Sequence, residues 1–268
     1  AGHLSAFTLT SVHFTDIGVS GVNDENLAAI LVRLQHQNVE GSQTHSLSQL
    51  KDIVDDQEAA LKAIQQTADN NHAFTLSIAD FEASGMTGVI ATNVTLIKEW
   101  LDTGAIDHTT ITHAQQLQAL IDAVNTVRTL ADGANNDGSS LSANAVTLLG
   151  LSSLIDSAQE RDLFSDFLDN ANRSQTDTAQ KIQNIASFTD RIITLANGGT
   201  PLVALTAQDF LDLQLDGVTD SNLTLVIQAI QTVPAGTLSR AALQNLIHTS
   251  NWQHSASTAS IAEAVQGI

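Results

Sequence analysis

The stretch FEASGMTGVIATNV, residues 81–94, places two glycines three residues apart, each followed by an apolar residue, and then an asparagine. The chain repeats this pattern as FTDIGVSGVNDENL at 14–27 and as FLDLQLDGVTDSNL at 210–223, and VTLLGLSSLIDSAQ at 146–159 is a diverged copy. A pattern that recurs at a fixed period indicates a repeat protein. We name these stretches, in chain order, the first to fourth elbows, and expect each to join two helices of a repeat.

The spacing supports four copies. The second glycine position of the elbow, occupied by serine in the third copy, recurs at steps of 67, 65 and 64 residues, and an apolar anchor further on keeps nearly the same period. We expect the elbow glycines to take positive φ, which ends the first helix and permits close backbone approach. These glycines are Gly18, Gly21, Gly85, Gly88, Gly150 and Gly217. The predicted core positions of the repeat are Phe14, Leu50, Phe81, Leu117, Val146, Ile182, Phe210 and Leu243.

Each repeat reads as three helices. A short first helix, such as SIADF or TAQDF, begins at a Ser or Thr cap with an aspartate three residues later. The second and third helices carry apolar residues three and four apart. We therefore predict an all-α fold of four tandem three-helix repeats of about 65 residues, packed as a rod or a compact stack. The predicted boundaries are 1–72, 73–138, 139–201 for the diverged repeat, and 202–268, whose third helix we expect to break after Ile247.

Composition excludes several function classes. The formal net charge of −19 disfavours nucleic acid and anionic membrane surfaces as partners. The chain holds no cysteine, which excludes disulfides, thiol catalysis and cysteine-ligated metals. No uncharged apolar run reaches the 18 residues that a membrane span needs. The charge suits a high-salt or calcium-containing medium, because salt screens the self-repulsion, and the absence of cysteine is compatible with export.

The motif search predicts a protein that is not an enzyme. The nine histidines form no HExxH pair, and the S-x-x-K match at 48–51 lacks its companion motifs. His108 and His113 could bind a metal ion, but we expect them to be a solvent-exposed pair instead. We expect no cofactor. The loop that contains Asp132, Asn135 and Asp137 resembles a calcium-binding loop in composition but does not match the EF-hand spacing, so calcium binding there is a minor hypothesis. Trp252, in the irregular NWQHS segment, is the candidate contact residue.

The pattern T-x-x-D-F-x-x-x-G-[apolar]-x-G-[apolar]-x-x-x-N, followed by a Gln-rich helix and ADG or ANG, resembles a helical repeat of very large bacterial secreted and cell-surface proteins, including RTX-type adhesins. Residues 77–133 carry it best, and the third elbow departs at Ser153 and Ala158. The resemblance implies an extracellular or cell-surface, repetitive, non-enzymatic role. In size and helix order the repeats are also similar to the albumin-binding modules of Gram-positive surface proteins.

Two functions follow as hypotheses. The first is a structural or adhesive bacterial protein that self-assembles into a filament, sheath or surface layer, or that acts as a spacer in an adhesin; its partners would be further copies of itself or other cell-surface proteins. The alternative is a protein-binding module that recognises a host or matrix protein with one helical face, which an exposed apolar stripe on the second and third helices of a single repeat would favour.

Overall fold

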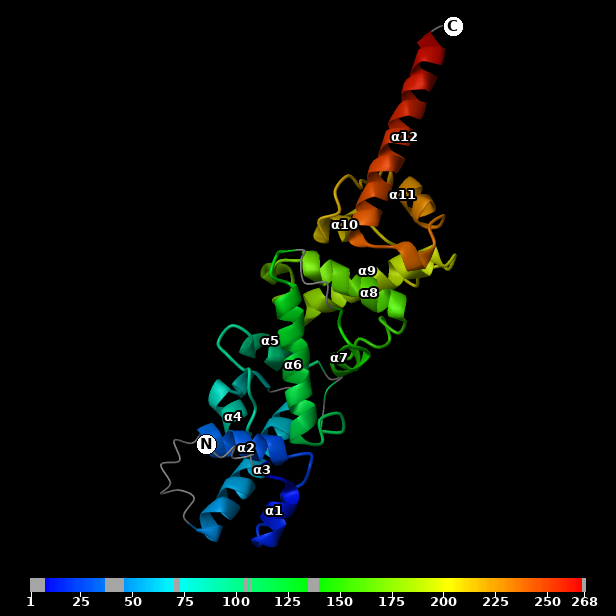
Figure 1. Cartoon of the computed structure of the whole chain (residues 1–268). Coiled ribbons are helices and arrows are strands. Elements are labelled where there is room, and N and C mark those ends of the chain that lie inside the picture. The colour runs from blue at the N-terminus through cyan, green and yellow to red at the C-terminus, as the bar shows by residue number, and fades with distance from the viewer. Residues whose placement is uncertain are drawn as a thin grey trace, which may run out of the picture. The chain divides into compact units, whose positions relative to one another are not determined.

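The computed structural model describes residues 8–36, 46–69, 73–103, 106, 108–134 and 140–266 (Figure 1). These residues form twelve α-helices, three 3₁₀ helices (η2 Ala73–Thr75, η3 Arg173–Gln175 and η4 Ala235–Thr237) and no strand. The predicted all-α class is confirmed. The chain divides into two compact lobes, the first comprising Ala1–Asn125 with Leu148–Gly150 and the second Thr126–Thr147 with Leu151–Ile268. These lobes are coarser than the four predicted repeats, which stay a prediction.

The first lobe is built around short helices that pack on one long helix. Its helices are α1 Ser11–Asp16, α2 Leu27–His36, α3 Leu47–Asp69, α4 Ile78–Ala83, α5 Val94–Leu101 and the part of α6 (Ala114–Leu130) that ends at Asn125. A small core of Phe14, Val19, Val22, Ile30 and Val54 joins α1, α2 and α3. The long helix α3 also packs against α4.

The second lobe has a core that is richer in aromatic side chains. It holds α7 Ala143–Leu148 except for its last residue, α8 Ala158–Asn170, α9 Ala179–Ala196, α10 Ala207–Asp212, α11 Leu223–Ile230 and α12 Arg240–Gln266. The ring of Phe188 meets Phe167 and Phe210 edge to face, at centroid distances of 5.4 and 5.2 Å. Such aromatic pairs add to the stability that area burial supplies, by about 1 kcal/mol each.

Helices α1, α4, α7 and α10 each span six residues. The sequence expectation of a Ser or Thr cap with an aspartate three residues on is confirmed in α4 and α10. The Asp80 carboxylate accepts hydrogen bonds from the backbone N–H and the hydroxyl of Ser77, and Asp209 does the same for Thr206. Each cap satisfies N–H groups that a helix start leaves without a partner.

The expected break in the last long helix is wrong. Helix α12 runs without interruption through residues 248–254, where the sequence reads HTSNWQH. Residues 240–266 hold no proline or glycine and six alanines, so nothing interrupts the helix. The hydroxyls of Thr249, Ser250 and Ser255 donate to the carbonyls four residues earlier, which satisfies these polar groups on the helix itself.

The predicted core positions lie inside the fold. Seven of them are buried, namely Phe14, Phe81, Leu117, Val146, Ile182, Phe210 and Leu243. Leu50, the eighth, is half-buried and packs against the core of the first lobe.

Candidate functional site

Every elbow ends its six-residue helix with the same hydrogen bond. The amide of the residue that follows the first glycine position donates to the carbonyl five residues earlier: Val19 to Phe14 (2.8 Å), Met86 to Phe81 (2.9 Å), Leu151 to Val146 (3.0 Å) and Leu215 to Phe210 (2.9 Å). This bond defines the Schellman motif, which requires positive φ at the preceding residue. The four donating residues are apolar and buried, so each elbow turns its side chain into the core, as the sequence predicts for Met86.

All six predicted elbow glycines have positive φ, between 63° and 94°. In the fourth elbow the first glycine position holds Gln214, at a φ of 56°, the one non-glycine residue with positive φ in the described part of the chain. The backbone geometry is therefore kept even where the sequence pattern is lost.

The asparagine of the pattern closes a second turn. In three elbows its Nδ2 donates to the carbonyl of the second glycine at 2.7 Å (Asn26 to Gly21, Asn93 to Gly88, Asn222 to Gly217). Its Oδ1 accepts the backbone N–H three residues earlier, at 2.7 or 2.8 Å. One side chain thus forms hydrogen bonds to the backbone on both sides of the turn that precedes the second helix.

In the second and fourth elbows, two amide side chains of the following long helix form hydrogen bonds to the elbow backbone. We call these two side chains the amide clamp: Gln118 and Asn125 of α6, and Gln244 and Asn251 of α12. Gln118 accepts from the Thr87 N–H at 2.8 Å and donates to the Thr87 carbonyl at 3.1 Å; Gln244 makes the same pair of bonds to Asp216. Asn125 and Asn251 donate to the carbonyls of Gly88 and Gly217 at 3.1 and 2.8 Å.

The second glycine takes positive φ in the first, second and fourth elbows, and the clamp adds a steric constraint in the second and fourth. A Cβ at Gly88 or Gly217 would lie 2.9 Å from the Nδ2 of the clamp asparagine, closer than van der Waals contact allows. The clamp was not predicted from the sequence. A signal was present, because in both helices a Gln directly follows the core leucine (Leu117 or Leu243) and an Asn stands seven residues further on.

The first and third elbows lack this clamp. The equivalent positions hold exposed Lys51 and Glu58 after the first elbow, and Gln183 and Asp190 after the third. In the third, where Ser153 and Ala158 replace Gly and Asn, helix α8 starts instead at a Ser157–Glu160 capping box, whose carboxylate accepts the Ser157 N–H at 2.8 Å. Burial, and secondarily the charges of Glu160 and Asp156, raise the pKa of Asp190 above its usual range.

In the first lobe, the second elbow meets α2 backbone to backbone. A Cβ on Gly85 would lie 2.3 Å from the carbonyl oxygen of Ala29. Beside this contact the buried Gln57 of α3 donates to the carbonyl of Ser84 at 3.0 Å. A groove of about 370 Å³ runs along it, lined by residues of α2, the elbow and α6. We call Ala29, Gln57, Ser84 and Gly85 the first junction.

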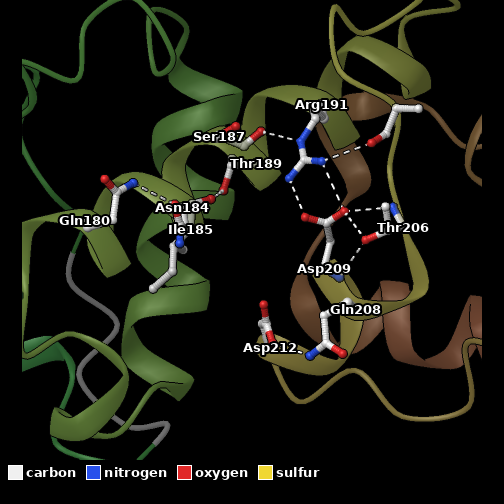
Figure 2. A network of polar contacts seen from close by, with 11 residues as sticks. Gln180, Asn184, Ile185, Ser187, Thr189, Arg191, Thr206, Gln208, Asp209 and Asp212 are labelled. Carbon is white, nitrogen blue, oxygen red and sulfur yellow. Dashed lines mark hydrogen bonds and ion pairs between the residues drawn. The ribbon is translucent and has the colours of Figure 1, made fainter.

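In the second lobe, an ion pair joins α9 to the start of α10 (Figure 2). The guanidinium of Arg191 donates to both carboxylate oxygens of Asp209, at 2.8 and 3.1 Å, and also to the carbonyls of Ser187 and Ala204. Burial acts to raise the pKa of Asp209, but the hydrogen bonds from Arg191 and Thr206 outweigh it and lower the pKa below its usual range. We call Arg191 and Asp209 the second junction.

A cavity in the second lobe lies beside this ion pair. Its volume is about 510 Å³, and its lining includes Lys181, Asn184, Ser187, Arg191 and Asp212. Its two cationic groups already have partners within the protein, since Lys181 donates to the Ser174 carbonyl at 2.7 Å and to Asp177 at 2.8 Å. The lining holds neither histidine nor cysteine.

The remaining predicted site residues lie apart from these contacts. Asp132 closes the end of α6 by accepting the Ala134 N–H at 2.8 Å, while Asn135 and Asp137 lie outside the described residues. Among described residues no group of three or more His, Asp or Glu is placed to hold a metal ion. His108 pairs with Asp69 at 2.9 Å. Trp252 is exposed on α12.

Comparison of the chain with protein-family models, with curated proteins and with solved structures finds no match. Within the described part of the chain, none of the helices combines the length and the apolar character that crossing a membrane requires.

Proposed function

We propose that this chain is a structural or adhesive bacterial protein of the cell surface or extracellular space, built of four tandem three-helix repeats and able to self-assemble. One observation carries the proposal: the same Schellman elbow, with its apolar residue turned into the core, occurs four times at nearly constant spacing. Repetition of a turn geometry at this precision is what a repetitive scaffold needs, since each repeat must present its faces in the same way as the last.

The repeats follow from grouping the helices around the elbows. Helices α1–α3, α4–α6, α7–α9 and α10–α12 each consist of a six-residue helix, an elbow, a second helix and a longer third helix. The side chains that form several hydrogen bonds between distant segments connect parts of these proposed repeats. The amide clamp holds elbows, and the two junctions hold a long third helix against the first helix or elbow that comes after it.

The surface location rests on the repeat pattern and its resemblance to repeats of bacterial secreted and cell-surface proteins. The net charge of −19 agrees with it, since such a chain stays soluble and is repelled by nucleic acids and anionic lipids. Its partners would be further copies of the chain or other cell-surface proteins, and it would need no cofactor.

A protein-binding module is the second candidate. The exposed apolar side chains of Leu225 and Trp252 favour it, because they lie on α11 and α12, the second and third helices of the proposed fourth repeat. As a module of this kind the chain would remain a monomer and bind a host or matrix protein with a helical face, as albumin-binding modules do.

Size-exclusion chromatography with multi-angle light scattering, run with calcium and with chelator and followed by negative-stain imaging, separates the two. The proposal expects masses above the 28.3 kDa of one chain and ordered filaments or sheets. A monomer at every concentration, with and without calcium, would contradict self-assembly. Direct titration of that monomer with purified serum albumin and matrix proteins would then test the binding-module alternative.

A further inference from the structure

The fourth elbow binds a cationic side chain that the second elbow lacks. The guanidinium of Arg240, the first residue of α12, donates to the carbonyl of Gln214 at 2.9 Å. Counted from the clamp glutamines and the elbow residues that they bind, the equivalent residues in the first lobe are Ala114 and Gly85. Ala114 has no group that could make this bond, and within the described part of the chain no group donates to the Gly85 carbonyl.

The space beside Ala114 and Gly85 is the groove of about 370 Å³ at the first junction, which we call the acidic groove. Its apolar lining consists of small side chains that include Ala28, Val32 and Ala119. Ligand sites in proteins range from about 300 to 1,000 Å³, so this groove is large enough for one long side chain and the short backbone segment that carries it.

The charged lining of the acidic groove has one sign. It contains the carboxylates of Asp24, Glu25 and Asp122 and no lysine, arginine or histidine. The carboxylate of Glu25 is exposed, and it forms no hydrogen bond or ion pair with any residue that the structure describes. Among those residues no group of three acidic or histidine side chains is placed to hold a metal ion. The arrangement therefore suits an organic cation, whose charge is spread over several donors.

We infer that the acidic groove binds an arginine side chain on an extended segment of a partner protein. The guanidinium would take the place that Arg240 has at the fourth elbow and donate to the Gly85 carbonyl, with the carboxylates of the groove around it. A guanidinium directs five N–H donors in one plane, which matches several oxygen acceptors at once, whereas an ammonium acts as a point charge.

Two further features support this partner. The methylene groups of an arginine would lie on the small apolar side chains of the groove while the charged end reaches the carboxylates. The net charge of −19 attracts a cationic segment toward the chain. The inference concerns the first lobe alone and does not depend on self-assembly.

NMR titration of the isotope-labelled full chain with the peptide acetyl-Ala-Arg-Ala-amide tests the inference. The matched neutral probe is the same peptide with citrulline, which keeps the shape of arginine without its charge. The backbone amides of Met86, Thr87 and Gln115 report on the acidic groove. The amide of Leu215 reports on the fourth elbow, where Arg240 already occupies the equivalent place.

We expect the arginine peptide to shift the groove amides in a saturable way and to leave the fourth elbow unchanged. The citrulline peptide should bind about tenfold more weakly, because it forms no charge-assisted hydrogen bonds. Glu25→Gln should weaken binding of the arginine peptide about threefold, as the loss of an exposed ion pair does. Asp220→Asn, at an exposed acid of the second lobe, is the matched control and should not change the affinity.

Both substitutions are at exposed positions, and unchanged circular dichroism and thermal melting verify that the fold is kept. Equal affinity for the two peptides, or shifts that do not saturate or lie outside the groove, would overturn the inference. Equal losses in Glu25→Gln and Asp220→Asn would also overturn it, because they would show attraction to the overall charge alone. The mass of the chain does not enter these measurements, so failure of this inference is distinguished from failure of self-assembly.

Discussion

The Nδ2 of Asn93 donates to the Oδ1 of Asn125 at 2.6 Å, and both side chains also donate to the carbonyl oxygen of Gly88. The two asparagines lie 32 residues apart in the sequence, at the start of α5 and within α6. Asn222 and Asn251 form the same triangle with Gly217 in the second lobe. A part-buried amide triangle of this kind links the elbow to the long helix by directional hydrogen bonds as well as by packing.

Substituting Asn93 tests how much this triangle stabilises the fold. Asn93 is 2% exposed, and Asn93→Ala leaves the Gly88 carbonyl and the Ile90 N–H without their shared partner. We expect the free energy of unfolding to fall by about 2 kcal/mol. Urea unfolding, followed by circular dichroism at 222 nm, measures the change.

Asn26→Ala is the matched control, because Asn26 makes the same bonds to its own elbow but has no clamp asparagine behind it. Its loss should be smaller, about 1 kcal/mol. The double variant of Asn93 and Asn125 should lose less than the two single losses added together. Strict additivity would show that the two side chains do not act as a unit.

Two substitutions at the same elbow position should have opposite signs. Gly85→Ala places a Cβ 2.3 Å from the Ala29 carbonyl at a φ of 79°, so we expect a loss of about 3 kcal/mol or more. Gln214→Gly removes a side chain from positive φ, and the exposed bond to Gln175 that it gives up is long at 3.3 Å. We expect Gln214→Gly to be neutral or to stabilise by up to about 1 kcal/mol. A destabilised Gln214→Gly variant, measured by thermal melting, would contradict this account of the elbow.

Two aspartates in the second lobe should respond to pH in opposite directions. The pKa of Asp209 is lowered in the folded chain, so its ionisation stabilises the fold above the usual aspartate range, and this contribution disappears as pH falls through the folded pKa. The pKa of Asp190 is raised, chiefly by burial, so its ionisation opposes folding and stability falls as pH rises through and above the usual aspartate range.

Asp209→Asn should therefore lower the melting temperature at pH 7, and Asp190→Asn should raise it, with both differences shrinking as the pH is lowered toward 3. Asp190 also occupies the position that holds the clamp asparagines Asn125 and Asn251 in two other long helices. Melting curves over this pH range measure both variants. Equal effects of the two substitutions at pH 7 would contradict the assignment.

The two tryptophans should report separately on the fold and on assembly. Trp100 is buried in α5 and Trp252 is exposed on α12. The variant Trp252→Phe should emit at short wavelength and resist iodide quenching, whereas Trp100→Phe should emit at long wavelength and be quenched. Quenching of Trp252 should decrease at concentrations where the chain assembles. If Trp252 stays equally quenched throughout assembly, it is not a residue of the contact between copies.

The sequence predicts the fold class and the elbows because both depend on local rules. Helical spacing, Ser and Thr caps and glycines at positive φ are set by residues close together in the chain, as Ser77 with Asp80 and Phe81 with Met86 show. The same local rules predict a break near Trp252 that does not occur, since hydroxyl groups there bond back to the helix.

Contacts between distant segments could not be predicted in this way. Gln118 with Thr87 and Arg191 with Asp209 depend on how a long helix lies against an elbow or a following helix, which one sequence does not specify. Gln214 was missed because its positive φ is imposed by the Schellman bond from Leu215 to Phe210, where the residue type indicates nothing. Once the contacts of one repeat are known, the repeat spacing identifies the equivalent residues of the others, but the spacing alone does not reveal the contacts.

Sedimentation equilibrium of the wild-type chain over a wide concentration range tests the central claim most directly. A protein that self-assembles into filaments or sheets should show a weight-average mass that rises from 28.3 kDa and keeps rising with concentration, because each added copy offers a further face for assembly. A mass that stays at 28.3 kDa at every concentration would contradict self-assembly. A plateau at twice that mass would contradict open growth into filaments or sheets and indicate a closed dimer.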